Sequence, residues 1–72
     1  MEKASVSITT EYIKLDALLK LADAVSSGGE AKILIQEGEV TVNGETCTQR
    51  GKKLRKGDRV EFAGLAFEIV QA

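Results

Sequence analysis

The residues in this sequence that are best suited to chemistry are those that could bind anions. The run Ser26-Ser27-Gly28-Gly29 precedes a predicted helix. The free N–H groups at a helix start attract phosphate, and glycines let a phosphate approach the backbone closely. Lys32 follows one helical turn later and can flank the same phosphate. The alternative is that serine and glycine form only a cap and a turn.

A second candidate for anion binding is the stretch from Arg50 to Arg59, RGKKLRKGDR. It holds six basic residues and one acid, whereas the rest of the chain holds four lysines and ten acids. Most charge runs are solvated loops that only add solubility. Here almost all of the charges are positive, although the rest of the chain is acidic. The glycines let the backbone follow a curved polyanion. The side chains selected as binding residues are Arg50, Lys52, Lys53, Arg55 and Lys56.

The sequence contains few residues that are suited to enzyme catalysis. The chain has no histidine to act near neutral pH, and its 11 carboxylates are scattered at spacings typical of surface and caps. Cys47 lies in a strand-like segment with no base partner, so we interpret it as a small buried apolar residue, with a reactive thiol as the alternative. We therefore expect no enzyme activity, no catalytic residue, no metal site and no cofactor.

Two short helices must position these residues. A helix is predicted to begin at Gly28, because Ser27 and Glu30 form a capping box, and to end at Gly38. An earlier helix is predicted from about Lys14 to Ala22. The inward-facing residues are Ala31, Leu34 and Ile35 in the later helix, and Leu15, Leu18, Leu19 and Ala22 in the earlier one.

Alternating apolar and polar residues predict short strands around the helices. These strands are Val6 to Ile8, with an extension toward Tyr12 or Ile13, then Val40 to Val42, Glu45 to Cys47, Val60 to Phe62 and Phe67 to Val70. Asn43-Gly44 is a strong hairpin-turn signal, and residues 48–53 are expected to form a loop or irregular strand. Leu54 is expected to point inward. The predicted fold class is α+β, with two short helices packed on a small antiparallel sheet of four to five strands.

Length and composition set the remaining limits. The 72 residues are 43% hydrophobic and 29% charged, with a net charge of −1, which predicts one globular domain over residues 1–72. The first ten residues contain no apolar run of signal-peptide type, and no later run approaches a membrane span. We therefore expect a cytoplasmic protein with no membrane partner, and favour a monomer.

Four motifs in this order resemble a known family. They are Lys14-Leu15-Asp16 ahead of Leu18-Leu19, then Ser27-Gly-Gly-Glu-Ala-Lys32, then Ile35-Gln-Glu-Gly38-Glu-Val40-Thr-Val42-Asn43-Gly44, and finally Lys53-Leu54-Arg-Lys-Gly57-Asp58 with Val60. Together they resemble the RNA-binding domain named after ribosomal small-subunit protein four, over residues 12–62 or so. Within this family, the sequence most resembles the short stand-alone bacterial members called YaaA-like or YbcJ-like.

The resemblance implies an RNA surface made by the second helix and the strand-and-loop region after it. By position, Lys14, Ser27 and Lys32 correspond to residues of that surface. Larger relatives often carry an arginine where this chain has Gly28, and a second basic residue near Ile33, which leaves more of the affinity to the basic stretch. The full expected RNA-binding set is Lys14, Ser27, Gly28, Gly29, Lys32, Arg50, Lys52, Lys53, Arg55 and Lys56.

The aromatic residues indicate what kind of RNA would be bound. They are Tyr12, Phe62 and Phe67, and both phenylalanines lie in inward-facing strand patterns. A surface for stacking unpaired bases is therefore poorly supplied, whereas lysines and helix-end N–H groups suit phosphate and shape contacts. Our leading hypothesis is a bacterial, ribosome-associated module for structured RNA, with ribosomal RNA as one candidate and translation or ribosome assembly as candidate processes.

Two other functions stay open. The first is a protein-interaction adaptor on the same fold with little RNA affinity, in which Ile33 and the charged faces would bind a protein partner. The second is a ubiquitin-like sulfur carrier, suggested by the phrases Val-Asn-Gly-Glu and Gly-Asp-Arg-Val-Glu. That chemistry needs a terminal glycine pair, and this sequence ends Val70-Gln71-Ala72, so we expect the carrier reading to fail.

Overall fold

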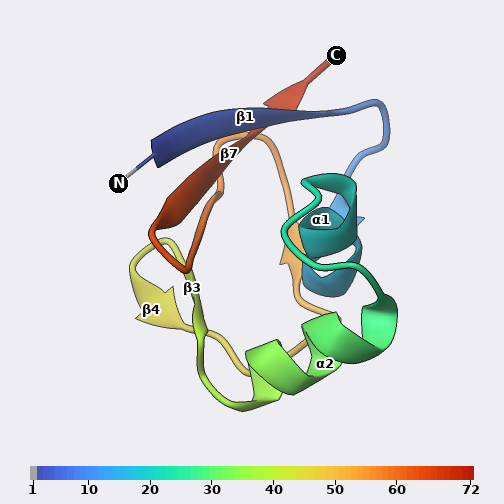
Figure 1. Ribbon diagram of the computed structural model, residues 1–72. Helices are drawn as coiled ribbons and strands as arrows, with labels where there is room; N and C mark the ends of the chain where they lie inside the picture. The colour runs from blue at the N-terminus through green and yellow to red at the C-terminus, as the bar shows by residue number, and fades with distance from the viewer. Residues whose placement is uncertain (1) are drawn as a thin grey trace.

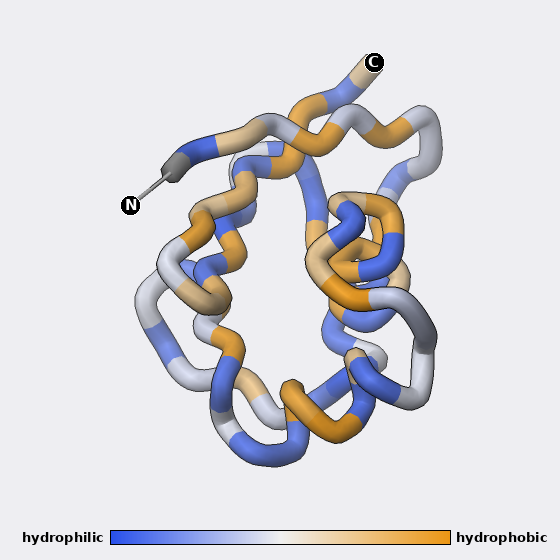
Figure 2. Tube along the Cα trace, in the orientation of Figure 1, coloured by the Kyte–Doolittle hydropathy of each residue, from blue (hydrophilic) through white to orange (hydrophobic). Residues whose placement is uncertain are grey.

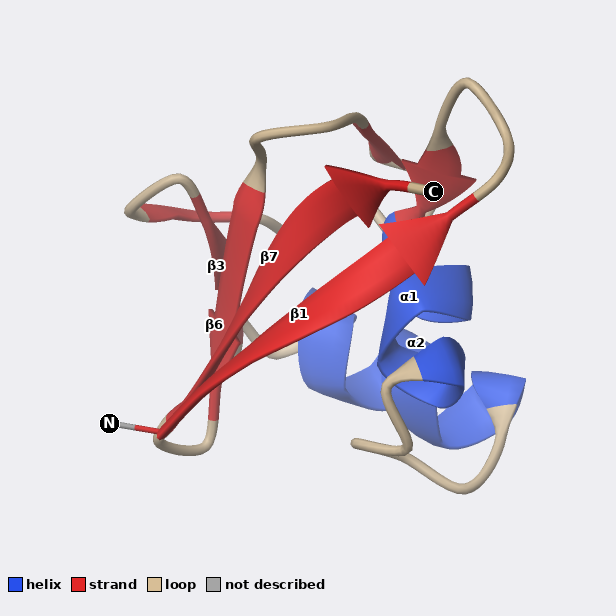
Figure 3. Ribbon diagram, turned by 90° about the horizontal axis from the view of Figure 1, so that it is seen from above, coloured by secondary structure: helices blue, strands red, loops and turns tan. Residues whose placement is uncertain are grey.

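The computed structural model describes residues 2–72, in which two helices lie on one side of a sheet (Figures 1 and 3). Five strands form this sheet, in the order β1-β7-β6-β3-β4. They are β1 (Glu2–Ile8), β3 (Val40–Val42), β4 (Glu45–Thr46), β6 (Arg59–Phe62) and β7 (Leu65–Gln71). A separate β2–β5 ribbon pairs β2 (Ile13–Lys14) with β5 (Lys53–Leu54). The helices are α1 (Leu15–Leu21) and α2 (Gly28–Gln36).

The sheet is mixed, and the prediction of a purely antiparallel sheet was wrong in this respect. Strand β1 runs parallel to β7 over its whole length, from Glu2 opposite Leu65 to Ile8 opposite Gln71. The other pairs, β7 with β6, β6 with β3 and β3 with β4, are antiparallel. Alternation shows that a strand is half-buried but not its direction, and a parallel pair needs a long connection, which the helices provide.

The predicted helix from Gly28 to Gly38 is confirmed with its caps. The Ser27 hydroxyl accepts the Glu30 N–H at 3.2 Å, as a capping box requires. The Glu30 carboxylate, however, accepts from the N–H of Ser26 rather than Ser27. At the other end Gly38 has a φ of 78°, and the N–H groups of Gly38 and Glu39 bond the carbonyls of Ile35 and Leu34, which is a Schellman closure.

The other elements also lie close to their expected places, with one addition. The earlier helix spans Leu15–Leu21, within the predicted range. The opening strand ends at Ile8, so the segment near Ile13 is not its extension but a separate strand, β2. The Asn43-Gly44 turn is confirmed, with positive φ at both residues joining β3 to β4. The loop expected up to residue 53 ends in β5 instead.

One hydrophobic core fills the space between the helices and the sheet. Leu54 is fully buried, as predicted, and so are Val60 and Ile69 on neighbouring strands. Figure 2 shows the apolar residues alternating along the strands and gathering on the helices. Phe67 is buried, but Phe62 and Cys47 are only half-buried, so the expectation that Cys47 is buried holds only in part. Ile33 and Leu21 are exposed.

Among residues 2–72, no group of three or more potential metal ligands comes together. The longer of the two helices has nine residues, and neither is long and apolar enough to cross a membrane.

The burial of Leu54 leads to a prediction about stability. Leu54→Ala should lower the free energy of unfolding by about 2–5 kcal/mol, because it removes a fully buried side chain and leaves a cavity. Urea unfolding followed by circular dichroism measures this. The control is Leu21→Ala at a side chain that is 59% exposed, which should change stability by less than about 0.5 kcal/mol. Equal losses in the two variants would contradict the packing described here.

Candidate nucleic-acid interface

The first turn of α1 is held by the basic stretch. The N–H of Leu15 donates to the Lys52 carbonyl at 2.9 Å, and the N–H of Asp16 donates to the Arg50 carbonyl at 3.1 Å. The helix has no side-chain cap from Lys14, so these two carbonyls satisfy N–H groups that a helix start leaves free. Residues 50–52 are therefore fixed against α1 through their backbone, which leaves their exposed side chains free to bind.

The β2–β5 ribbon brings a second pair of positive charges together. Lys14 and Lys53 are direct cross-strand partners, and both are exposed. Like charges in directly opposite positions repel each other, so this pair lowers stability unless an anion lies between or near them. We call Lys14, Arg50, Lys52 and Lys53 the basic cluster. It combines two residues on the ribbon with two on the loop that caps α1.

Tyr12 holds one lysine of the cluster. The Lys53 ammonium lies over the Tyr12 ring, 4.9 Å from its centre, which is a cation–π contact. Tyr12 is half-buried directly before β2, and its carbonyl accepts the Thr10 hydroxyl at 2.8 Å. The ring therefore orients the ammonium of Lys53, the cross-strand partner of Lys14.

The N-terminus of α2 carries the other predicted phosphate site. Ser27 accepts the Glu30 N–H, whereas the N–H groups of Gly28 and Gly29 have no acceptor among the described residues. These free N–H groups and the positive end of the helix dipole therefore both suit an anion. The Glu30 carboxylate lies at the same helix start, bonded to the N–H of Ser26 at 3.3 Å, and opposes an anion there. Each of the two sites therefore has a carboxylate close by, Glu30 at the start of α2 and Asp16 in the first turn of α1.

Lys20 adds a positive charge beside this helix start. A Cβ atom built on Gly28 would lie 4.0 Å from Cδ of Lys20, so the lysine stem passes along Gly28. Lys20 is exposed in the last turn of α1, and Lys32 is exposed on α2. The two lysines flank the N-terminus of α2 from different helices.

Arg55 and Lys56 belong to a different part of the surface. They lie in the turn between β5 and β6, where the Asp58 carboxylate accepts the N–H of Arg55 at 2.8 Å. Backbone bonds between this turn and Ile69 dock it on β7, with the N–H of Gly57 donating to the Ile69 carbonyl. Both side chains are exposed, but the turn is anchored to the sheet and not to α1.

The predicted residues therefore form three groups rather than one site. The basic cluster lies at the start of α1, and the Ser27-Gly28-Gly29 start of α2 lies beside Lys20 at the end of α1. From Leu15 to Lys20 the helix rises roughly 8 Å, so both groups can face one ligand of nucleic-acid size. Arg55 and Lys56 form the third group, in the turn that is bonded to Ile69 of β7.

Sequence reasoning did not find three features of this surface. They are the Tyr12 contact with Lys53, the position of Lys20 beside Gly28, and the capping carbonyls of Arg50 and Lys52. Tyr12 and Lys53 are far apart in the chain, so only the β2–β5 pairing makes them neighbours. The sequence carries no local signal of this pairing, because each of the two strands has only two residues.

The mixed sheet, the two helices on one face and the basic cluster define a small α+β domain with an exposed group of positive charges. The family model described as "S4 domain" matches residues 6–70. The chain therefore belongs to the S4 domain family.

Relatives of known name agree with this assignment. The chain is 50% identical over 66 residues to the "Probable ribosome maturation protein RlbA" of Bacillus subtilis, covering 90% of this chain and 93% of the relative. It is 41% identical over 59 residues to the "Putative RNA-binding protein YbcJ" of Escherichia coli, covering 82% and 84%.

Two solved structures have a similar fold. The solution structure of E. coli YbcJ, described as revealing an "ALFAL motif involved in RNA-binding", matches with a TM-score of 0.72 and 38% identity, over 93% of this chain and 86% of that one. The ribosomal protein S4e of Thermoplasma acidophilum matches with a TM-score of 0.62 and 22% identity, over 83% of this chain and 32% of that one, and supports the fold alone.

The contact between Tyr12 and Lys53 can be tested without a ligand. In the native protein the Hε protons of Lys53 should resonate upfield of those of other lysines, because the ring current of Tyr12 acts on them. Tyr12→Leu should remove this shift, and the matched variant Tyr12→Phe should keep it, because cation–π attraction needs the ring and not the hydroxyl. NMR of side-chain lysine signals measures both. An unshifted Lys53 in the native protein would contradict the contact.

Proposed function

We propose that this protein is a non-enzymatic module that binds structured RNA, through phosphate and shape contacts made by the basic cluster and the N-terminus of α2. In this proposal the whole chain acts as one RNA-binding domain. Its relatives RlbA and YbcJ carry names that refer to ribosome maturation and RNA binding, which supports the proposal.

The observation that carries the proposal is the position of Lys14 opposite Lys53. A chain with a net charge of −1 places two exposed lysines in register, next to Arg50 and Lys52. Such an arrangement costs stability in the free protein and is relieved by a bound phosphate. Phosphates that follow one another along a folded RNA offer several such contacts at once.

The aromatic residues favour structured RNA over an unpaired strand. Phe67 is buried, Phe62 is half-buried against the core, and the ring of Tyr12 is partly covered by Lys53. Modules for single-stranded RNA stack bases on exposed rings. This protein offers charges and N–H groups instead, which bind through the backbone of an already folded RNA.

Several finer points belong to the same proposal. We infer that ribosomal RNA is a target, that the protein works as a monomer in the cytoplasm, and that it needs no cofactor. The similarity to a protein named for ribosome maturation supports the first of these. Ile33 is 57% exposed beside Lys32 and is compatible with a protein contact, but no further observation favours the adaptor function.

Binding to a structured ribosomal RNA fragment at several salt concentrations tests the proposal. With about four phosphates neutralised, affinity should fall roughly a hundredfold between 50 and 200 mM salt. The double variant Lys14→Gln, Lys53→Gln should reduce the slope of log K against log salt by about 2, because two phosphate contacts are lost. The control Lys3→Gln removes a charge on β1 and should leave the slope unchanged. Equal slopes in the native protein and the double variant would refute the proposed surface.

A gain of charge at Gly28 provides an independent test. Gly28→Arg should increase the salt slope by about 1 and tighten binding, because it adds a cation beside Lys20 at the proposed RNA surface. The side chain fits, since its Cβ would meet only the Lys20 stem, at 4.0 Å. The control Ser5→Arg adds the same charge to exposed β1. If both variants strengthen binding equally, only net charge matters and the position of the surface is wrong.

A further inference from the structure

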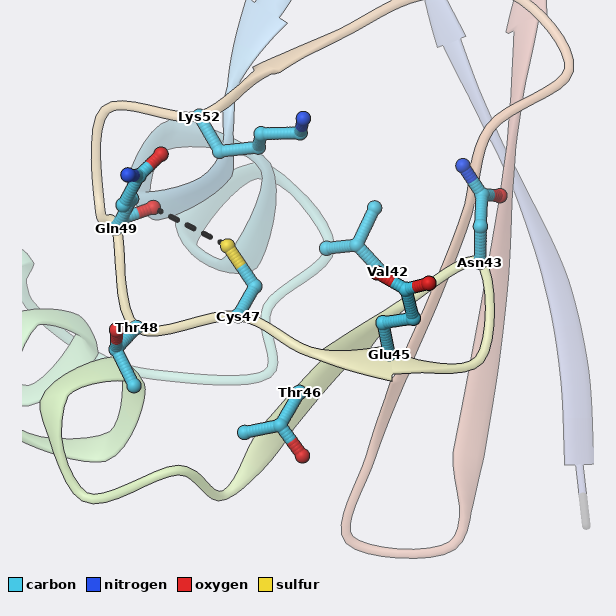
Figure 4. A pocket seen from close by; sticks show the side chains of 8 residues that line it. All are labelled: Val42, Asn43, Glu45, Thr46, Cys47, Thr48, Gln49 and Lys52. Carbon is cyan, nitrogen blue, oxygen red and sulfur yellow. Dashed lines mark hydrogen bonds between the residues drawn. The ribbon is translucent and has the colours of Figure 1, made fainter.

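A pocket lies between the β3–β4 hairpin and the loop that caps α1. Its volume is 390 Å³, within the range of pockets that hold small organic groups. We call it the hairpin pocket, and Figure 4 shows it with its side chains. The lining residues are Val42, Asn43, Glu45, Thr46, Cys47, Thr48, Gln49 and Lys52.

The pocket combines an apolar floor with a polar loop side. Val42 is 6% exposed, and the half-buried Cys47 donates its thiol to the Gln49 carbonyl at 3.6 Å. The Gln49 amide and the Lys52 ammonium have no hydrogen-bond partner among residues 2–72. In Figure 4 the Lys52 side chain extends across toward Val42 and Asn43. A flat group with apolar faces and a polar edge would match these walls.

Asn43 also lines the pocket, but its amide is already used. Its Nδ2 donates to the Asp58 carboxylate at 3.2 Å, and its Oδ1 accepts the N–H of Arg59 at 2.9 Å. Asn43 therefore fixes the hairpin against β6 and is not free for a ligand. The groups left to select a ligand are Gln49, Lys52 and the exposed Glu45 carboxylate, with the hydroxyls of Thr46 and Thr48 at the margin.

The pocket is continuous with the basic cluster. Lys52 belongs to both, and its backbone position is set by its carbonyl, which accepts the N–H of Leu15. An RNA whose phosphates lie on Lys14 and Lys53 would pass beside the opening. A nucleotide that is not held in a base pair could then turn its base into the pocket while its phosphate stays on the cluster.

We propose that the hairpin pocket binds one unpaired guanine of the RNA, a step that rests on the proposed function. Lysine donates well to the O6 and N7 acceptors of guanine, and the Gln49 amide oxygen can accept from its N1 and N2 donors. Uracil does not have two neighbouring acceptors followed by two neighbouring donors, so it cannot make the same set of hydrogen bonds. The pocket has no aromatic wall, so recognition depends on the edge of the base and not on stacking.

Three RNA hairpins with one common stem test this proposal. The first is fully paired, the second has one bulged guanine and the third one bulged uracil. The native protein should bind the guanine bulge about tenfold more tightly than either other RNA, the discrimination expected of one well-placed pair of hydrogen bonds to a base edge. Gln49→Met keeps the length of the side chain and removes its amide, so the preference should fall below about twofold while the salt slope for the paired stem stays the same.

Controls separate this proposal from the proposed function. Gln36→Met makes the same change on exposed α2 and should keep the preference for guanine. NMR signals of Val42 and Cys47 should move on adding the guanine-bulge RNA and not the paired stem. If the native protein binds all three RNAs equally but with a steep salt slope, the pocket proposal is wrong and the RNA-binding proposal stands. If it binds none of them in a salt-dependent way, both are overturned.

Discussion

The first turn of α1 depends on two backbone carbonyls from far along the chain, those of Arg50 and Lys52. They occupy N–H groups that no side chain of the helix caps, and buried Leu54 fixes the same segment to the core. Backbone atoms form these bonds, so the bonds do not require the charged side chains of Arg50 and Lys52. Folding and charge presentation are therefore carried by different atoms of the same residues, and the charges can be removed by substitution while the bonds remain.

The second feature of this surface is the repulsion between two like charges, which lowers the stability of the fold. A domain of 72 residues has little stability to spare, yet Lys14 and Lys53 lie directly opposite each other. The cation–π contact with Tyr12 offsets part of the repulsion by giving Lys53 an attractive partner. Carboxylates moderate the field nearby, with Asp16 in the first turn of α1 and Glu30 at the start of α2. In the proposed function a bound phosphate would relieve the rest, which is why we propose the strongest contact at the ribbon.

Local signals predicted most of the fold, and long-range pairing accounts for what they did not. The Ser27 cap, the Gly38 stop and the Asn43-Gly44 turn depend on a few adjacent residues, so they could be read from the sequence. Alternation located the strands but not their direction, so the parallel β1–β7 pair was missed. Strand β2 was missed because two residues are too few for a pattern. The same limit applies to the site. The basic residues were identified individually, but their division into three groups depends on pairings across some forty residues.

The most direct test of the account is an NMR titration of the labelled protein with a structured ribosomal RNA fragment, following every backbone amide. The account predicts that the largest shifts occur at Lys14 to Asp16, at Arg50 to Lys53 and at Gly28 and Gly29, with little change at Lys3, Ser5 and Glu68. Those last three residues line a hollow on β1 and β7, away from the basic cluster. Shifts centred on β1 and β7, or spread evenly over the molecule, would contradict the claim that the capped start of α1 is the RNA-binding surface.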